Sequence, residues 1–509
     1  MTACTAARLS FALPIALISQ SAFADLTPQD VWGNTREYVE SLGYEFSASE
    51  SMLGTTLVVD DAQLRFPLGE RGGDDYLSIT LGVMQFVAND DGTVSLVMQD
   101  VTPINVVGVE DGEVITRIDM SYTQAGHSMT FSGEPDNLSS EFQADSLALS
   151  IDSMMDGGNE LDMSETFFTV TATDFVSVAT TQLGELRNLR QSGSIGSLKY
   201  DLGAAVGSRE TFMLGGEVSN FTYETVGSLS RELAVMVNMA EMIRSGVTVD
   251  SKINFAASSL SMKFDARYSG SFDWSSSSTD GFYATRLGPE GVAYDINHAN
   301  LKVDANFDRA DVPIASELGE SAISIALPVL KSEDAQDFEL GLALTNLSIS
   351  EALWSLFDPG SQLGRDPASL DIDITGKAKL LFDLFDPGAA AQLRGAPPAE
   401  LNSFTLGRLF VSAAGVALEG SGAIEVDPNG PPMIPGIGMP VGAFDVSLAG
   451  ANGLIDNLVA MGILPQEQLM GARMMMGAFT VPGDAPDTIV SKIELTQEGQ
   501  IFANGQRIQ

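Results

Sequence analysis

Cysteine and histidine are almost absent from this chain. Among 509 residues there is one cysteine, Cys4, and the histidines are His127 and His298. Zinc sites need three or four Cys or His ligands, or two His with an acid. Triad and Cys-His catalysis need a histidine beside a nucleophile, and neither histidine has a recognisable partner in the sequence. We therefore interpret both histidines as structural and predict no metal ligand and no catalytic residue.

Motifs for phosphate, nucleotide or acyl chemistry are also missing. The chain has no Gly-x-Ser-x-Gly elbow and no Gly-x-x-x-x-Gly-Lys-Ser/Thr loop. The segment from Asp371 to Gly376 begins like a calcium loop, but Phe382 occupies the twelfth position, where a glutamate is required. Its alternation of Asp with Ile is typical of a half-exposed strand. The sequence predicts no cofactor.

Positive charge is scarce. The chain has 26 Lys and Arg against 68 Asp and Glu, a formal charge of −42. Such a charge repels nucleic acid and anionic headgroups, so we exclude a nucleic-acid partner and disfavour docking on a membrane through a basic face. We interpret the acidity as a solvated surface; calcium or a cationic partner is the alternative.

The one long apolar run lies near the N-terminus. Arg8 precedes the run from Leu9 to Ile18, and Ala22-Phe23-Ala24 follows it. The order of these regions predicts a secretory signal peptide cleaved between Ala24 and Asp25, since the run is about half of the ~20 residues that span a bilayer. Cys4 would leave with the peptide. We expect an exported, periplasmic protein whose mature chain has no disulfide and no transmembrane segment.

The rest of the chain has the composition of a folded protein. Hydrophobic residues make up 44% and the mean hydropathy is +0.11, which argues against disorder. Length alone suggests about three domains, although long β architectures can form one unit. We divide the chain into the signal peptide at 1–24, an N-terminal half at 25–245 and a C-terminal half at 246–509.

Helices are expected at the start, in the middle and near the end. Thr27-Pro28-Gln29-Asp30 predicts an N-cap, a proline in the first turn and an acid at the positive helix end, with Gly43 as the stop. The residue periodicity then predicts helices at Val31 to Leu42, Val226 to Ile243, Glu351 to Phe357, Gly453 to Met461 and Pro465 to Phe479.

Elsewhere apolar residues alternate with polar ones, which indicates strands. Asp90-Asp91-Gly92 and Glu110-Asp111-Gly112 predict hairpin turns between such strands. The fold class is therefore mainly β, or β-rich α+β: long, twisted antiparallel sheets with a few packing or capping helices, and groove-like in shape. Strands are predicted at Thr56 to Val59, Leu64 to Phe66, Leu77 to Leu81, Val94 to Met98, Ser128 to Phe131, Ser146 to Ile151, Phe167 to Thr173, Lys252 to Phe264, Tyr268 to Trp274, Ala293 to Phe307, Ile323 to Leu327, Phe338 to Ile349, Leu370 to Leu380, Phe404 to Leu418, Ile489 to Leu495 and Gln500 to Phe502.

Two local features remain. Leu356 to Gly360 and Leu384 to Gly388 repeat the motif Leu-Phe-Asp-Pro-Gly, which we interpret as two helix-ending turns. Methionines gather in two expected helices, and we interpret them as core residues, with a soft surface for an apolar ligand or partner as the alternative. They are Met236, Met239, Met242, Met470, Met474, Met475 and Met476.

The segment from Asn452 to Arg507 carries a family resemblance. Its runs Asn452 to Gly462, Gly471 to Met475, Phe479 to Gly483 and Gly499 to Arg507 resemble an exported alphaproteobacterial family, domain of unknown function 2125. The resemblance supplies no activity and no site residues. The alternation of strands and short helices is also similar to AsmA-like periplasmic proteins, which hold lipid in β grooves; that similarity is one of architecture.

Three functions fit the sequence. The first is a non-enzymatic protein that binds a lipid, another apolar molecule or an envelope partner on its sheet. The second is a periplasmic hydrolase with two acids in one cleft, one of them with a raised pKa. The third is a scaffold without a ligand. If protein covers every apolar strand face, the first hypothesis fails.

Overall fold

The computed structural model describes residues 26–68, 75–206, 210–231, 239–266, 270–308, 313–386, 388, 397–428, 430–431 and 437–508. The expected signal peptide, Cys4 and the Ala24/Asp25 cleavage site lie outside these residues.

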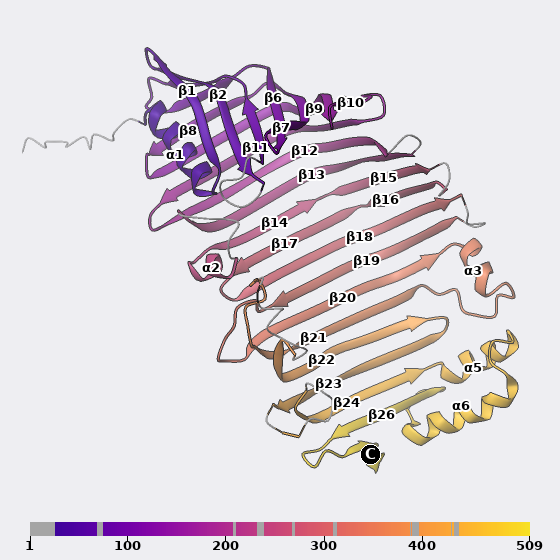
Figure 1. Ribbon diagram of the computed structural model, residues 1–509. Coiled ribbons are helices and arrows are strands. Elements are labelled where there is room, and N and C mark those ends of the chain that lie inside the picture. Colours follow the sequence, from indigo (N-terminus) through magenta and orange to yellow (C-terminus); the bar gives the residue numbers. More distant parts are fainter. Residues whose placement is uncertain are drawn as a thin grey trace, which may run out of the picture.

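The described chain forms one antiparallel sheet of 28 strands (Figure 1). The structure is 66% strand and 11% helix, so the predicted mainly β class is confirmed. The first strands are β1 (Glu45–Leu53), β2 (Thr56–Pro67), β3 (Tyr76–Leu81), β4 (Met84–Ala88), β5 (Val94–Met98), β6 (Val101–Glu110), β7 (Glu113–Ala125), β8 (Ser128–Glu134), β9 (Asn137–Asp156), β10 (Asn159–Glu160), β11 (Phe167–Leu183), β12 (Leu186–Val206) and β13 (Glu210–Ser230).

The second half of the chain continues the same sheet, because β13 pairs directly with β14 and β15. The strands are β14 (Thr248–Phe255), β15 (Ala257–Ala266), β16 (Phe272–Ser278), β17 (Asp280–Gly288), β18 (Gly291–Phe307), β19 (Ile314–Leu327), β20 (Gln336–Ile349), β21 (Ala368–Leu380), β22 (Ala399–Ala413), β23 (Val416–Asp427), β24 (Met439–Ala449), β25 (Val481–Pro482), β26 (Thr488–Leu495), β27 (Ile501–Ala503) and β28 (Gln506–Arg507). The long strands pair in chain order from β9 to β13 and from β18 to β24, as in a meander. Between these two parts, β14 pairs with β17 and β15 pairs with β16.

The helices lie at the ends of the strands and at the start of the sheet. In Figure 1, α2 lies at one edge, while α3, α5 and α6 lie at the opposite edge. The helices are α1 (Pro28–Ser41), α2 (Met239–Arg244), α3 (Glu351–Phe357), α5 (Ala451–Ala460) and α6 (Gln466–Phe479).

Helix α1 forms as its sequence predicts and covers the N-terminal end of the sheet. The Thr27 hydroxyl accepts a hydrogen bond from the Asp30 N–H at 3.2 Å, and the Asp30 carboxylate accepts one from the Thr27 N–H at 3.0 Å. This reciprocal cap satisfies two of the free donors at the helix start. The Trp32 ring lies 5.3 Å from Phe46 and 5.7 Å from Phe86, centre to centre, in the largest buried cluster of the described residues.

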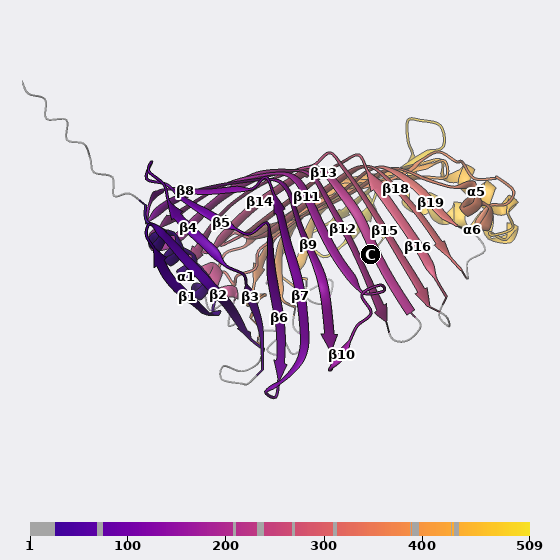
Figure 2. The same ribbon diagram turned by 90° about the horizontal axis from the view of Figure 1, so that it is seen from above.

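A line of residues with left-handed backbone crosses the sheet. Five non-glycine residues inside strands have positive φ: Asp61, Asp174, Asn220, Asn300 and Asn346, at 49° to 56°. The pairing register shifts beside Asp61 and beside Asn346, as at a β-bulge, which bends its strand and increases the local twist. Figure 2 shows the sheet as a curved surface, with α1 on the inner side of the curve.

Glycines opposite these residues make room for their side chains. A Cβ on Gly196 would lie 2.7 Å from a carboxylate oxygen of Asp174, and one on Gly319 would lie 3.2 Å from Asn346. Small residues are therefore needed beside these positions.

The structure corrects several local predictions. Residues 226–230 of the expected helix belong to strand β13, and the described helix there is Met239–Arg244. The expected strand from Lys252 to Phe264 is two strands, β14 and β15, which pair with different parts of β13. The expected strand from Phe404 to Leu418 is two strands, β22 and β23, joined by a turn at Ala414 and Gly415. The strand β12 was not predicted, because its Gly and Ser residues interrupt the apolar alternation. The second Leu-Phe-Asp-Pro-Gly motif follows strand β21 and not a helix; its Pro387 lies outside the described residues.

Candidate ligand-binding face

One face of the sheet carries a continuous row of mostly apolar side chains. Directly paired residues of antiparallel strands have their side chains on the same face, so the strand register defines this row. We call it the central row, and the face that bears it the apolar face. Its members are Leu57, Phe86, Leu96, Met129, Phe142, Ser177, Gly193, Tyr223, Ile253, Tyr283, Ile296, Ile323, Leu342, Ile372, Leu409, Gly420 and Val446.

The covering of this row changes along the sheet. Beneath α1, Leu57 and Phe86 are each 3% exposed. From Tyr223 to Val446 every side chain of the row that has a Cβ is half-buried or exposed. Ile323 in the row is 37% exposed, and Tyr294 and Leu340 beside it are 45% and 38% exposed. Most of the apolar face therefore has no second layer of protein on it.

The face is not wholly apolar. Gln191 donates hydrogen bonds of 3.2 Å to the Ser177 hydroxyl and to the Tyr223 hydroxyl, and Tyr223 donates to Ser177 at 2.9 Å. These groups satisfy one another, which lowers the cost of placing them on a half-buried surface. They mark the position where the covered end of the face passes into the open part.

His298 also points onto this face. Its Nε2 lies 2.7 Å from the Tyr283 hydroxyl, and the Phe255 ring lies 5.7 Å from its ring centre. Burial lowers the pKa of His298 and raises that of Tyr283. The described contacts of His298 include no carboxylate, and His127 lies in the connection between β7 and β8. The two histidines predicted to be structural are thus in different parts of the fold and form no pair.

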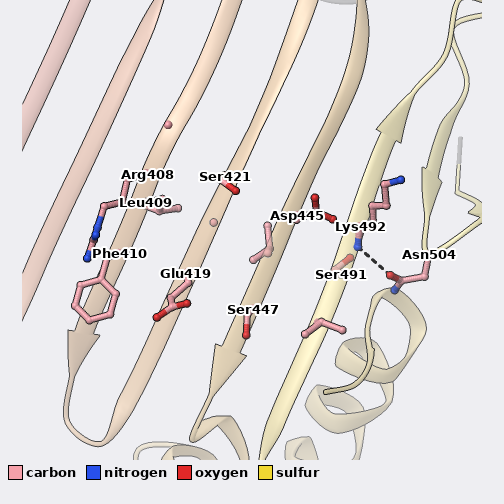
Figure 3. A pocket seen from close by; sticks show the side chains of 14 residues that line it. Arg408, Leu409, Phe410, Glu419, Ser421, Asp445, Ser447, Ser491, Lys492 and Asn504 are labelled. Carbon is pink, nitrogen blue, oxygen red and sulfur yellow. Dashed lines mark hydrogen bonds between the residues drawn. The ribbon is translucent and has the colours of Figure 1, made fainter. Parts of the chain in front are cut away.

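The opposite face is polar and holds cross-strand ion pairs. Lys302 contacts Glu317 at 2.8 Å and Lys199 contacts Glu217 at 3.6 Å, each pair directly opposed on neighbouring strands. A hollow of about 560 Å³ lies over β22, β23, β24 and β26 (Figure 3). The two cations that line it are paired with carboxylates, since Arg408 contacts Asp371 at 2.7 Å and Lys492 contacts Glu494 at 2.9 Å. The charges left over in its lining are the carboxylates of Glu419 and Asp445, which do not suit an anionic ligand.

Carboxyl groups show no arrangement that favours hydrolysis. Where the pKa of an aspartate is displaced, hydrogen bonds lower it; for Asp119 the donors are Ser153 and Asn105. A general acid needs a raised pKa. The aspartates with a lowered pKa are Asp91, Asp119, Asp162, Asp358, Asp383 and Asp487. Among the described residues, no group of three or more His, Cys, Asp or Glu is placed to hold a metal ion.

The family comparison covers half of this sheet. A model of uncharacterized proteins conserved in bacteria, DUF2125, matches residues 252–507, from β14 to β28. The chain belongs to this family. The predicted family is confirmed, whereas the similarity to AsmA-like proteins is not. No curated protein sequence matches the chain.

The DUF2125 region contains the open part of the apolar face from Ile253 to Val446, and α1 lies outside it. Within the described residues, no helix is long and apolar enough to cross a membrane.

The first Leu-Phe-Asp-Pro-Gly motif ends helix α3, in the DUF2125 region, as predicted. Asp358, 1% exposed, follows α3 and accepts hydrogen bonds from the N–H groups of Gln362 and Leu363 at 2.9 Å and from Arg365 at 2.6 Å. Burial raises the pKa of this carboxyl, but the hydrogen bonds and the Arg365 charge outweigh it, so the pKa is lowered. The motif is a structural turn.

Two methionines of α6 are exposed and are not core residues. Met470 is 79% exposed and Met474 is 71% exposed, so the core interpretation is wrong for both. Met239 is 43% exposed, and Met236 lies outside the described residues.

Proposed function

We propose that this DUF2125 protein is exported to the periplasm and binds a lipid or another apolar molecule along its apolar face, without catalysing a reaction. The observation that carries this proposal is the central row, which continues across the sheet from Tyr223 to Val446 without a covering layer. Monomeric soluble proteins rarely expose large contiguous apolar surfaces, and those that do use them for binding.

The curvature supports the same function. The sheet is curved in Figure 2, and Asn220, Asn300 and Asn346 hold left-handed backbone in strands β13, β18 and β20 of its open part. A curved apolar surface contacts an elongated ligand over more area than a flat one does. On the opposite face, exposed charged side chains form ion pairs, such as that of Lys302 with Glu317. The two faces are therefore chemically distinct.

The test is the mass of the protein as the cell makes it. The mature chain is purified from its own periplasm without detergent, and its native mass is compared with the mass after organic extraction. We expect a stoichiometric apolar molecule that extraction removes. A bare polypeptide mass, together with no binding of added fatty acid, would contradict the proposal. The N-terminus of the purified chain tests cleavage after Ala24 in the same experiment.

A pair of variants on one strand locates the binding surface. Ile372 lies in the central row on β21, and Thr375 is exposed on the polar face of the same strand. Ile372→Asn removes apolar contact area, and we expect a roughly three- to tenfold weaker affinity for a fluorescent fatty acid. Thr375→Asn should leave the affinity unchanged. Equal effects of the two substitutions would place binding elsewhere.

A further inference from the structure

A buried arginine lies at the covered end of the apolar face. Arg187 on β12 is 3% exposed and pairs with Leu183 and Leu229, in line with the inward-facing Leu189 and Gln191. Its Nη1 donates to the Asn34 side-chain oxygen at 3.0 Å, and its guanidinium carbon lies 5.2 Å from the centre of the Tyr38 ring. The Asn34 amide also donates to the Pro135 carbonyl at 2.7 Å, which holds the amide oxygen toward Arg187.

The other edge of this guanidinium has no hydrogen-bond acceptor among the described residues. Nε and Nη2 of Arg187 are buried and make no hydrogen bond. The nearest carboxylate oxygen, on Glu37, is 3.9 Å from Nη2, beyond hydrogen-bond distance. A buried donor without a partner is costly and rare. These two nitrogens form the planar fork with which arginine binds a carboxylate or phosphate through two parallel hydrogen bonds.

Glu37 does not neutralise the charge of Arg187, because it also binds a second arginine. Its Oε1 accepts a hydrogen bond from Nε of Arg231 at 2.9 Å. Two guanidinium groups therefore share one carboxylate, which leaves an excess of positive charge. The chain as a whole has a formal charge of −42, so this buried positive excess runs against the composition of the protein.

A hollow that could hold part of a ligand lies beside Arg187. It measures about 260 Å³ and lies between α1 and strands β8, β9, β11 and β12, and Arg187 contributes to its wall. The wall also includes Val31, Leu138 and Gln191. Since Gln191 donates to the Tyr223 hydroxyl, the hollow adjoins the open part of the central row.

From this geometry we infer that Arg187 binds the carboxylate or phosphate head of an anionic amphiphile whose apolar chain lies along the central row. This inference rests on the proposed function and names the class of its ligand. The two free nitrogens of Arg187 would bind the charged head of the ligand. The uncovered row from Tyr223 onward would contact its apolar chain. Arg187 was missed in the sequence because a single arginine in a strand carries no motif; its inward position, two residues before Leu189, is the one available signal.

The test compares ligands that share a chain and differ in charge. Oleate, oleyl phosphate and oleyl alcohol are titrated calorimetrically into the mature wild-type chain below their aggregation concentrations. We expect oleate and oleyl phosphate to bind at least ~10-fold more tightly than oleyl alcohol, because charge-assisted hydrogen bonds to a desolvated arginine are strong. Acetate and inorganic phosphate should bind at least ~10-fold more weakly than the oleyl ligands of the same charge.

Arg187→Gln should abolish the preference for the charged ligands. Lys199→Gln is the matched control: Lys199 lies on the polar face of the same strand and is ion-paired with Glu217 at 3.6 Å, with its side chain 60% exposed. We expect this control to keep the wild-type preference. If Arg187→Gln does not fold, as judged by circular dichroism, the wild-type comparison still decides the question.

The outcomes separate this inference from the proposed function. Equal affinity of the wild-type chain for oleate and oleyl alcohol would overturn the role of Arg187 and leave apolar binding intact. Tight binding of acetate or phosphate alone would overturn the amphiphile. Binding of none of the oleyl ligands would overturn both proposals together.

Discussion

The two ends of the apolar face have the same alternation of apolar and polar residues, but they differ in how far their side chains are covered. At the N-terminal end α1 lies on the face, and Leu57 and Phe86 are each 3% exposed. Farther along the same row, Ile323 is 37% exposed, with Leu340 beside it at 38%. Alternation of apolar and polar residues therefore specifies which side of a strand is apolar, but a separate element decides whether that side becomes core or stays open.

The largest expected effect is at the covered end. Trp32→Ala removes the ring that packs on Phe46 and Phe86, and loss of a buried Trp side chain costs about 3–5 kcal/mol. The free energy of unfolding from urea denaturation measures this. Tyr294→Ala, at a side chain 45% exposed on the open part, should cost less than about 1 kcal/mol. Similar losses at the two positions would show that the open part is packed in solution.

The left-handed backbone at Asn300 should come next. Asn300 has φ of 49° and donates to the Thr279 hydroxyl at 2.8 Å. Asn300→Val places a β-branched residue in left-handed backbone, and we expect a loss of about 1–3 kcal/mol. Asn300→Gly removes the same hydrogen bond but tolerates the backbone, so it should lose clearly less. Equal losses of unfolding free energy for both substitutions in urea denaturation would show that the backbone conformation at this position does not limit stability.

A smaller effect is expected at the helix cap. Thr27→Ala removes the side-chain acceptor for the Asp30 N–H, and such caps contribute about 1 kcal/mol. The loss should appear in the free energy of unfolding and in the tryptophan fluorescence of the covered end. Thr27→Ser keeps a hydroxyl and should retain most of the stability; an equal loss in both variants would assign the effect to something other than the cap.

The smallest effect is a pH dependence in the open part. Burial lowers the pKa of His298 in the folded protein, so the unfolded chain binds the proton more readily. The contribution of His298 to stability is therefore complete above its unfolded pKa of about 6.5 and declines as pH falls from there toward the lowered folded pKa. His298→Gln should make the urea midpoint less dependent on pH over this range. If the midpoint of the variant changes with pH as steeply as that of the wild type, His298 is not the group responsible.

Much of the fold was predictable because it depends on local pattern. The cap at Thr27 and the Asp90-Asp91-Gly92 and Asp111-Gly112 turns depend on neighbouring residues, and the structure confirms them. The long strand β13 was partly mistaken for a helix, since its last residues, such as Val226 and Leu229, fit three- and four-residue spacing. Pairing with β12 and β14 decided the outcome there, and pairing is not local.

The candidate site was less predictable. Central-row residues and core residues share the same period of two, and only the position of α1 distinguishes Leu57 from Ile323. Asn220 and Asn300 were visible as polar residues inside strands, but their left-handed backbone depends on the neighbouring strands. The free edge of Arg187 depends on residues far apart in the chain, since Glu37 is drawn to Arg231.

The order of the strands has a consequence for how the chain reaches its shape. Most described strands after β9 pair with a strand that precedes them in the chain, so a chain that emerges N-terminus first can add them in the order in which they emerge. Local pairing of this kind keeps loop-closure costs low. The edge left by one strand is then the template on which the next strand folds.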